Sequence, residues 1–200
     1  MNAKKKILAV ALAASMAVLA VGGSSLAYFT DTDNAHNEFT VGNVQINLEE
    51  PAWEANPDHE DVYPGEALPK DPIVTNTGAN PAVVRIKLTM PEDVTFETNY
   101  QTGEVGKGWV YYNGYYYYTT PLTTEEPGNV TTALFDQIRL STSVTNPEGT
   151  NLDRDVVVDV QAVQAQGIFP SYDTIADGID VETELPTVAA FFDNAFANQN

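Results

Sequence analysis

Apolar and polar residues alternate along most of the chain from Phe39 onward, a pattern typical of short strands with one buried face. Phe39 and Val41 begin the alternation, and Val44, Ile46 and Leu48 continue it. Further β-rich segments lie at 73–78, where a strand ends in a turn, and at 84–88, 94–98, 109–118, 134–144 and 156–160. Turn-forming residues separate these segments about every ten residues, and this spacing predicts an all-β fold, an antiparallel β-sandwich.

The segment at 84–88 shows how such a strand is oriented. Val84, Ile86 and Leu88 share one face, and Arg85 and Lys87 share the other. Because successive side chains of a strand point to opposite faces, we expect an apolar face toward the core and a charged face away from it.

The segment Trp109–Tyr118 predicts a β-hairpin, because Asn113-Gly114 separates two β-rich runs and both residues of such a turn adopt positive φ. Facing tyrosines would stabilise it by cross-strand pairing. Exposed aromatic residues mark interaction sites. One interpretation is therefore a stripe for glycan binding or self-association, made of Trp109, Tyr111, Tyr115 and Tyr117. The alternative is an ordinary hairpin whose tyrosine face packs on the core.

Three segments depart from the alternating pattern. Residues 30–37 are polar and turn-forming. Residues 51–72 contain five prolines and many acidic residues, which predicts an irregular surface loop without room for a helix of useful length. Apolar residues between Pro186 and Phe196 have the spacing of a short amphipathic C-terminal helix.

The N-terminus has the features of a cleaved signal peptide. Residues 4–6 are lysines, residues 7–21 are small and mostly apolar, and small residues precede a cleavage site between Ala27 and Tyr28. As a helix the apolar run would span about 22 Å, less than the roughly 30 Å hydrocarbon core of a bilayer. We therefore expect export with a signal peptidase as partner, and no transmembrane segment in the mature chain.

Charge narrows the range of partners. Removal of residues 1–27 leaves six basic residues against 28 acidic ones, a net charge of −22. This charge argues against nucleic acid and anionic membranes as partners. An exported chain without cysteine cannot use disulfides and depends on its core for stability. These features predict a secreted protein with a solvated extracellular surface.

Several short segments occur in an order that resembles a known family. They lie at 27–31, 39–44, 63–66, 76–78, 84–85 and 160–165. In these segments the chain resembles the TasA/camelysin (CalY) family of Gram-positive bacteria, whose members are exported through a signal peptidase of the SipW type. The resemblance implies a jelly-roll sandwich and a structural role in biofilm matrix fibres, where the N-terminal segment of one subunit completes a sheet in the next. It does not place the tyrosine-rich hairpin or the acidic C-terminal half.

On this resemblance the chain divides into a signal peptide (1–27), an exposed N-terminal segment and candidate donor strand (28–42), and a single β-sandwich domain (43–200). Burying Tyr28, Phe29, Phe39 and Val41 in a neighbour would contribute about 1.5–3 kcal/mol each, against an association cost of about 4–15 kcal/mol. Because these two free energies nearly cancel, main-chain hydrogen bonds must make the association favourable. The head-to-tail contact would give filaments of this protein, alone or with related matrix subunits. Alternatively, Phe39 and Val41 belong to the protein's own first strand and residues 28–37 are disordered.

The camelysin name also implies a metalloprotease, which the residues do not favour. His36 and His59 are the two histidines of the chain. His59-Glu60 begins like the H-E-x-x-H zinc motif, but Tyr63 stands at the second ligand position and flanking prolines exclude the helix. A catalytic zinc takes three protein ligands, so we expect no enzymatic activity. The alternatives to a fibre subunit are a cell-surface metalloprotease of camelysin type and a monomeric glycan-binding module.

No cofactor is expected, although two acidic groups could hold calcium. One lies within residues 151–155, and the other contains Asp173, Asp177, Asp180 and Glu182. Neither has the spacing of an EF-hand loop. In a chain this negative, solvated acidic loops are the simpler interpretation.

Overall fold

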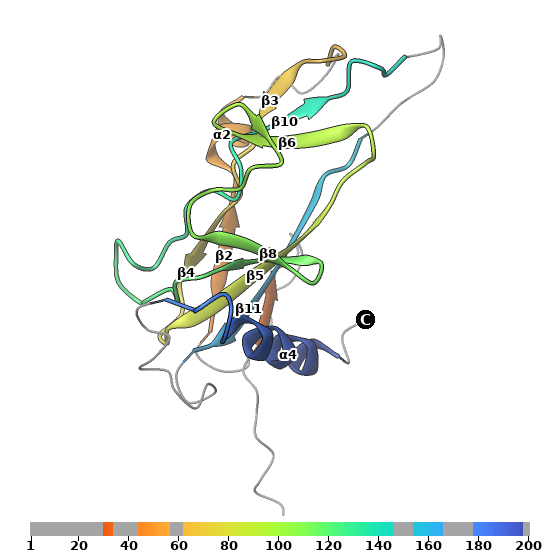
Figure 1. The fold of residues 1–200 in the computed structure, drawn as a ribbon. Coiled ribbons are helices and arrows are strands. Elements are labelled where there is room, and N and C mark those ends of the chain that lie inside the picture. Colours follow the sequence, from red (N-terminus) through yellow and green to blue (C-terminus); the bar gives the residue numbers. More distant parts are fainter. Residues whose placement is uncertain (1–29, 34–43, 57–61, 146–153, 166–177, 198–200) are drawn as a thin grey trace, which may run out of the picture.

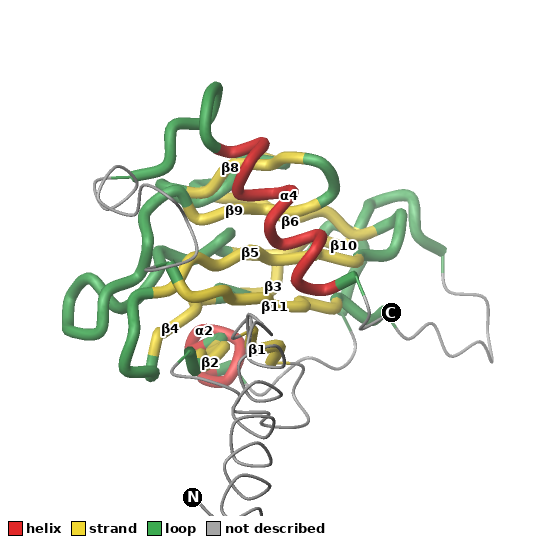
Figure 2. Tube along the Cα trace, turned by 90° about the horizontal axis from the view of Figure 1, so that it is seen from below, coloured by secondary structure: helices red, strands yellow, loops and turns green. Residues whose placement is uncertain are grey.

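The computed structural model describes residues 30–33, 44–56, 62–145, 154–165 and 178–197 (Figure 1). Its largest sheet is antiparallel and has the strand order β1-β11-β5-β9-β8. The strands are β1 (Thr30–Asp33), β11 (Val157–Gln164), β5 (Ala82–Thr89), β9 (Tyr115–Tyr118) and β8 (Trp109–Tyr112). Figure 2 shows β1 and β8 at opposite rims of this sheet.

Two smaller antiparallel sheets complete the β structure. One has the order β3-β10-β6-β7, and the other pairs β2 with β4. Their strands are β3 (Ala67–Pro69), β10 (Gln137–Leu140), β6 (Val94–Thr98), β7 (Gln101–Thr102), β2 (Ile46–Glu49) and β4 (Ile73–Asn76). The four-stranded sheet lies at one end of the molecule and the C-terminal helix at the other (Figure 1).

The main core forms where the three sheets meet. It contains Val84 and Ile86 of β5, Val160 of β11, Phe96 of β6 and Val74 of β4, all at most 8 % exposed. Burying a side chain of this size contributes about 1.5–3 kcal/mol. The alternation of apolar residues along each strand therefore explains the position of this core.

Helix α4 (Leu185–Phe196) covers the opposite face of the five-stranded sheet (Figure 2). Leu185, Val188, Phe192 and Phe196 are buried at helical spacing and pack with Val83, Tyr117 and Val163 of the sheet. The proline at 186 lies in the first turn, where its missing N–H costs no helical hydrogen bond. Strand β5 is consequently buried on both faces.

The predicted β-rich architecture is confirmed at the level of antiparallel sheets with a short C-terminal helix. The strands expected within 73–78, at 94–98 and around the Asn113-Gly114 turn are present, the first of them over Ile73–Asn76. Residues 39 and 41 lie outside the described part of the chain. The jelly-roll connectivity implied by the family resemblance stays a prediction.

Two expectations about secondary structure are wrong. The segment 51–72 is not wholly irregular, since it contains helix α2 (Pro51–Ala55) and strand β3. A proline at the first helical position does not oppose a helix, and the Ala52 N–H is satisfied by the Asp71 carboxylate at 2.7 Å. Residues 30–33 form strand β1 rather than a turn, because pairing with β11 outweighs their weak intrinsic preference for β structure.

Candidate assembly edge

Strand β1 occupies one edge of the five-stranded sheet by pairing with β11. Thr30 lies opposite Val163 and Asp33 opposite Val160. On its other side β11 pairs with β5 along all eight of its residues, whereas β1 has four residues. Among the described residues, the outer edge of β11 therefore has no strand partner at 157–159 or at Gln164.

The strand that receives β1 is firmly held. Val160 and Ala162 belong to the main core, Val163 belongs to the cluster under α4, and all three are 0 % exposed. Val157, at the uncovered end, is 44 % exposed. A strand buried on both faces but open along its edge is a template to which an extended segment can add through main-chain hydrogen bonds.

Ten residues separate β1 from Val44. Val44 is 2 % exposed and Ile46 is 5 % exposed, so the chain is anchored in the main core from residue 44 onward. Ten residues can span at most roughly 33–36 Å when extended. A connection of this length is enough to carry β1 to a neighbouring molecule.

All of the predicted assembly residues lie outside the described part of the chain. Ala27 and Tyr28 of the cleavage site, and Phe29, Phe39 and Val41 of the candidate donor strand, lie outside the described residues. What the structure adds is the register of the four residues between them, and the identity of β11 as the strand that they pair with.

The tyrosine hairpin forms as predicted, with φ of 49° at Asn113 and 89° at Gly114. Residues directly opposite one another share a face, so Trp109 and Tyr111 lie toward the main core and Tyr115 and Tyr117 lie toward α4. Trp109 is 6 % exposed, Tyr117 is 0 % exposed and Tyr111 is 60 % exposed. The four candidate stripe residues are therefore divided between the two faces of the hairpin.

A buried cation that the sequence did not reveal lies beneath α4. Arg85 is 2 % exposed, and its Nη1 donates to the Tyr117 hydroxyl at 3.0 Å and to Asp193 Oδ1 at 2.7 Å. Its Nε donates to Gln161 Oε1 at 2.7 Å, and its guanidinium lies 3.7 Å from the Tyr115 ring centroid. Burial raises the pKa of the Tyr117 hydroxyl, which the Arg85 hydrogen bond partly offsets. These bonds join α4 to β5, β9 and β11.

A second ionic cluster holds the four-stranded sheet together. The Glu97 side chain is 5 % exposed and accepts hydrogen bonds from Arg139 Nε at 2.7 Å, from Arg139 Nη2 at 3.0 Å and from Gln137 Nε2. The Arg139 hydrogen bonds are the main cause that lowers the pKa of Glu97 to about 2. Arg139 Nη1 also donates to the Gly65 carbonyl at 2.7 Å, so the cluster also holds the loop that precedes β3.

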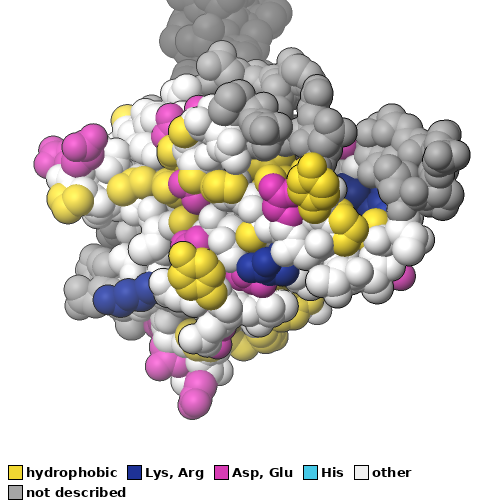
Figure 3. All heavy atoms as spheres, turned by 90° about the horizontal axis from the view of Figure 1, so that it is seen from above, with side chains coloured by type: hydrophobic (Ala, Val, Ile, Leu, Met, Phe, Trp, Pro, Cys, Tyr) yellow, Lys and Arg dark blue, Asp and Glu magenta, His cyan; other side chains and the backbone are white. Residues whose placement is uncertain are grey.

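The candidate metal ligands are only partly described. Asp180 Oδ1 accepts from the N–H groups of Glu182 and Thr183 at 2.9 and 2.8 Å, which caps the turn before α4 and lowers the Asp180 pKa. Asp173 and Asp177, both histidines and residues 151–153 lie outside the described part. Within the described residues no three His, Cys, Asp or Glu side chains are grouped to hold a metal. On the face seen from above, acidic side chains are scattered among uncharged ones (Figure 3).

Comparison with known proteins gives one family. The family model of the camelysin metallo-endopeptidases matches residues 2–107, which includes β1 through β7 and ends just before the tyrosine hairpin. No curated protein and no solved structure matches the chain. In the described part of the chain, neither helix has the length and apolar character needed to cross a membrane.

Proposed function

The chain belongs to the camelysin metallo-endopeptidase family, which includes TasA and CalY, and we propose that it acts as a secreted structural subunit of extracellular matrix fibres. A signal peptidase would cut between Ala27 and Tyr28 and release residues 28–42 as the donor segment. Each subunit would then place its β1 on the β11 edge of the next, giving a head-to-tail filament of this protein, alone or with related matrix subunits.

The observation that supports this proposal is the pairing of β1 with only half of the β11 edge, through a strand tethered by ten residues. An exchanged strand would make the same four-residue ladder in the neighbour. Extending this register would put Phe29 opposite Gln164 and Tyr28 opposite Ala165, where the outer edge of β11 is open in the described structure. The added main-chain bonds favour the longer pairing.

Strand β1 is also suited to exchange by its composition. Its sequence is Thr-Asp-Thr-Asp, and aspartate is depleted in strands because it fits a pleated, half-buried surface poorly. A short strand of this kind contributes little to the stability of its own subunit. Leaving that subunit therefore costs less than it would for an apolar strand such as β5.

Cysteine pairs provide a direct test, because the chain has no cysteine of its own. Thr32 and Gln161 lie directly opposite each other, within the Cα separation that a disulfide requires. In the chain from Tyr28, oxidising the Thr32→Cys/Gln161→Cys variant after assembly is expected to give a ladder of covalent multimers on a non-reducing gel. In unassembled protein the same pair is expected to close within one chain.

The matched control is the Thr89→Cys/Val157→Cys pair, which joins β5 to β11 inside one subunit. It should close within one chain before and after assembly. A chain starting at Asn43 should form no filaments in negative-stain microscopy. Filaments from that shorter chain, or assembled protein whose 32/161 disulfide stays within single chains, would contradict strand exchange.

The family description favours a second candidate, a metallo-endopeptidase. The chain offers two histidines and no cysteine as soft ligands, so any zinc site would need a carboxylate as well. Cleavage of an unfolded protein that stops with a chelator, returns with Zn²⁺ and is lost in a His59→Ala variant would establish this activity. Cleavage unaffected by the chelator and the variant would point to a contaminating protease.

A further inference from the structure

We propose that the open edge of β8 pairs with β8 of a second copy of this chain, joining two five-stranded sheets across a two-fold axis. This contact is separate from β1 exchange, since β8 and β1 lie at opposite edges of the sheet (Figure 2). It would link two molecules, or two filaments, side by side.

The hydrogen-bond pattern of the hairpin shows which groups of β8 face outward. Thr119 N–H donates to the Gly108 carbonyl at 2.8 Å, and hydrogen-bonded pairs alternate along an antiparallel ladder. The pairs Val110–Tyr117 and Tyr112–Tyr115 therefore carry the remaining bonds to β9. The backbone groups of residues 109 and 111 point to the open edge.

One of these outward-facing backbone groups already forms a hydrogen bond within the chain. Trp109 N–H donates to the Gly106 carbonyl at 3.1 Å. The Trp109 carbonyl and both backbone groups of Tyr111 remain, and within the described part of the chain β9 is the one strand that β8 pairs with. An antiparallel pairing centred on Tyr111 uses these groups: Tyr111 exchanges two bonds with its counterpart, and each Trp109 carbonyl accepts from the Asn113 N–H of the other copy.

The side chains suit this register. Tyr111 is 60 % exposed and its ring lies 5.0 Å from that of Tyr116, so pairing would align four tyrosine rings, two from each copy, on one face. On the other face Tyr112, 36 % exposed, would lie opposite Val110 of the second copy. Aromatic and β-branched partners of this kind stabilise neighbouring strands.

The other outer strands carry features that discourage pairing, and β8 does not. Proteins protect edges with charged residues, prolines or very short strands. Strand β1 contains two aspartates, β2 ends in Glu49, β3 ends in Pro69 and β7 has two residues. The outer side of β4 is covered by residues 129–131, which bond to its backbone. Strand β8 reads Trp-Val-Tyr-Tyr, with neither charge nor proline.

Charge identifies a second copy as the occupant. Residues 105–124 contain no Asp or Glu, although the whole chain has 28. Two copies with a strongly negative charge repel each other over most of their surface. Strand β8 and its neighbours in the sequence bring no carboxylate of their own to this edge, and its uncharged side chains can pair with those of a second copy.

A single cysteine tests the register. In the chain from Tyr28, Tyr111→Cys would face its counterpart at a Cα separation of about 5.5 Å, which a disulfide can bridge. Mild oxidation is expected to give a covalent dimer. The matched variant Tyr112→Cys would lie opposite Val110, on the other face, and is expected to dimerise at least about tenfold more slowly. Equal rates for both variants, or no dimer from Tyr111→Cys, would overturn the proposal.

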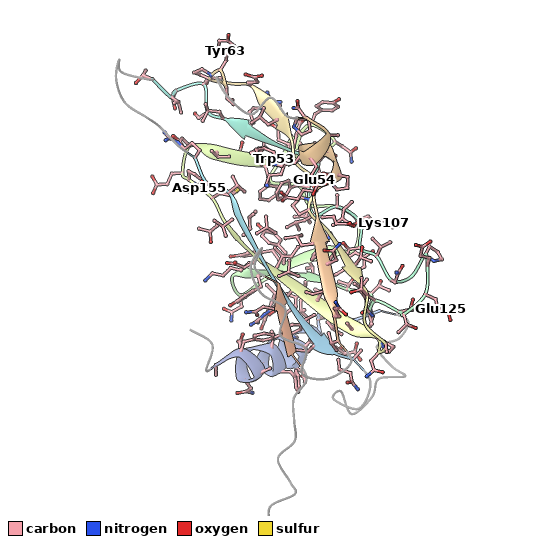
Figure 4. The ribbon with its side chains drawn as sticks, turned by 180° about the vertical axis from the view of Figure 1, so that it is seen from behind. Trp53, Glu54, Tyr63, Lys107, Glu125 and Asp155 are labelled. Carbon is pink, nitrogen blue, oxygen red and sulfur yellow. The ribbon has the colours of Figure 1, made fainter. Side chains whose placement is uncertain are left out.

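The second measurement is the self-association of the wild type and of charged variants, followed by sedimentation without any cross-link. Tyr111→Glu would place two carboxylates directly opposite each other and is expected to weaken self-association of the chain at least about tenfold. Tyr63→Glu is the control, because Tyr63 is 73 % exposed and lies far from Lys107 at the base of the hairpin (Figure 4). The proposal of β8 pairing would also be overturned if both variants weakened self-association equally, or if the wild type stayed monomeric at every concentration. Loss of filaments in the chain from Asn43, with the Tyr111→Cys dimer retained, would separate this contact from β1 exchange.

Discussion

Two buried ionic residues show how a charge comes to lie inside this fold. Glu97 accepts three hydrogen bonds from Arg139 and Gln137, and Arg85 is surrounded by Tyr117, Gln161 and Asp193. A buried charge is tolerated when its partners replace the water that it loses. Both clusters join strands that are far apart in the sequence, so they stabilise tertiary rather than local structure.

Glu97 leads to a prediction about pH. Its pKa is about 2 in the folded protein, against 4.5 for an ordinary glutamate. A carboxyl group with a lowered folded-state pKa stabilises the protein fully above its unfolded-state pKa and loses that contribution as the pH falls toward its folded-state pKa. Glu97→Gln should therefore lower the free energy of unfolding at pH 7 by about 1.5–3 kcal/mol. The difference from wild type should shrink between pH 4.5 and pH 2.

Urea denaturation of both proteins across this range measures the difference. Glu92→Gln is the control, because Glu92 is exposed and its substitution should change stability by less than about 0.5 kcal/mol. A Glu97→Gln difference that stays constant from pH 7 to pH 2 would show that the carboxylate charge is not its cause.

The burial of Arg85 is a feature that the sequence pattern does not predict. The alternation of 84–88 correctly separates Arg85 from Val84 and Ile86. It implies a solvent-facing arginine, yet Arg85 is 2 % exposed. Nothing near Arg85 in the sequence indicates that a helix about a hundred residues later covers this face, because the Arg85–Asp193 contact spans 108 positions. Local patterns give the face of a strand but not what packs on it.

Among the elements, those determined by short-range chemistry were predicted well. The Asn113-Gly114 hairpin follows from the backbone freedom of two adjacent residues. Helix α4 follows from its apolar spacing, and the structure places its start one residue before the predicted Pro186. Helix α2 and β1 were missed, since one depends on a contact with Asp71 and the other on β11. Such partners cannot be read from the segment itself.

Helix α4 is expected to be essential for the stability of the whole sheet. Phe192 is 0 % exposed, contacts the Tyr117 ring edge-on at 5.9 Å and lies under the Arg85 guanidinium at 4.7 Å. Phe192→Ala removes these contacts and leaves a cavity, so it should lower the free energy of unfolding by about 3–5 kcal/mol. Asn194→Ala, on the exposed side of the same helix, should change it by less than about 0.5 kcal/mol. A loss below 1 kcal/mol for Phe192→Ala would mean that α4 is only loosely attached.

At the scale of the whole molecule, charge opposes the assembly that strand exchange would drive. Without residues 1–27 the chain carries six basic and 28 acidic residues, a net charge of −22. Copies of such a chain repel one another at low ionic strength. Both proposed contacts, the exchange of β1 and the pairing of β8, must overcome this repulsion with main-chain hydrogen bonds and apolar burial.

Assembly of the chain from Tyr28 should therefore increase with salt. The screening length is about 30 Å at 0.01 M ionic strength and about 8 Å at 0.15 M, so most of the repulsion between copies disappears over this range. Light scattering during a titration with NaCl is expected to show assembly at a protein concentration that falls as the salt rises. MgCl₂ at equal ionic strength should give the same result if screening is the cause, and a stronger effect only if divalent cations bind the carboxylates. The chain from Asn43 should form no filaments at any salt concentration, because screening removes repulsion but does not supply the missing strand. Assembly that weakens with salt would instead show that attraction between opposite charges holds the subunits together, and strand exchange would then not be its main source.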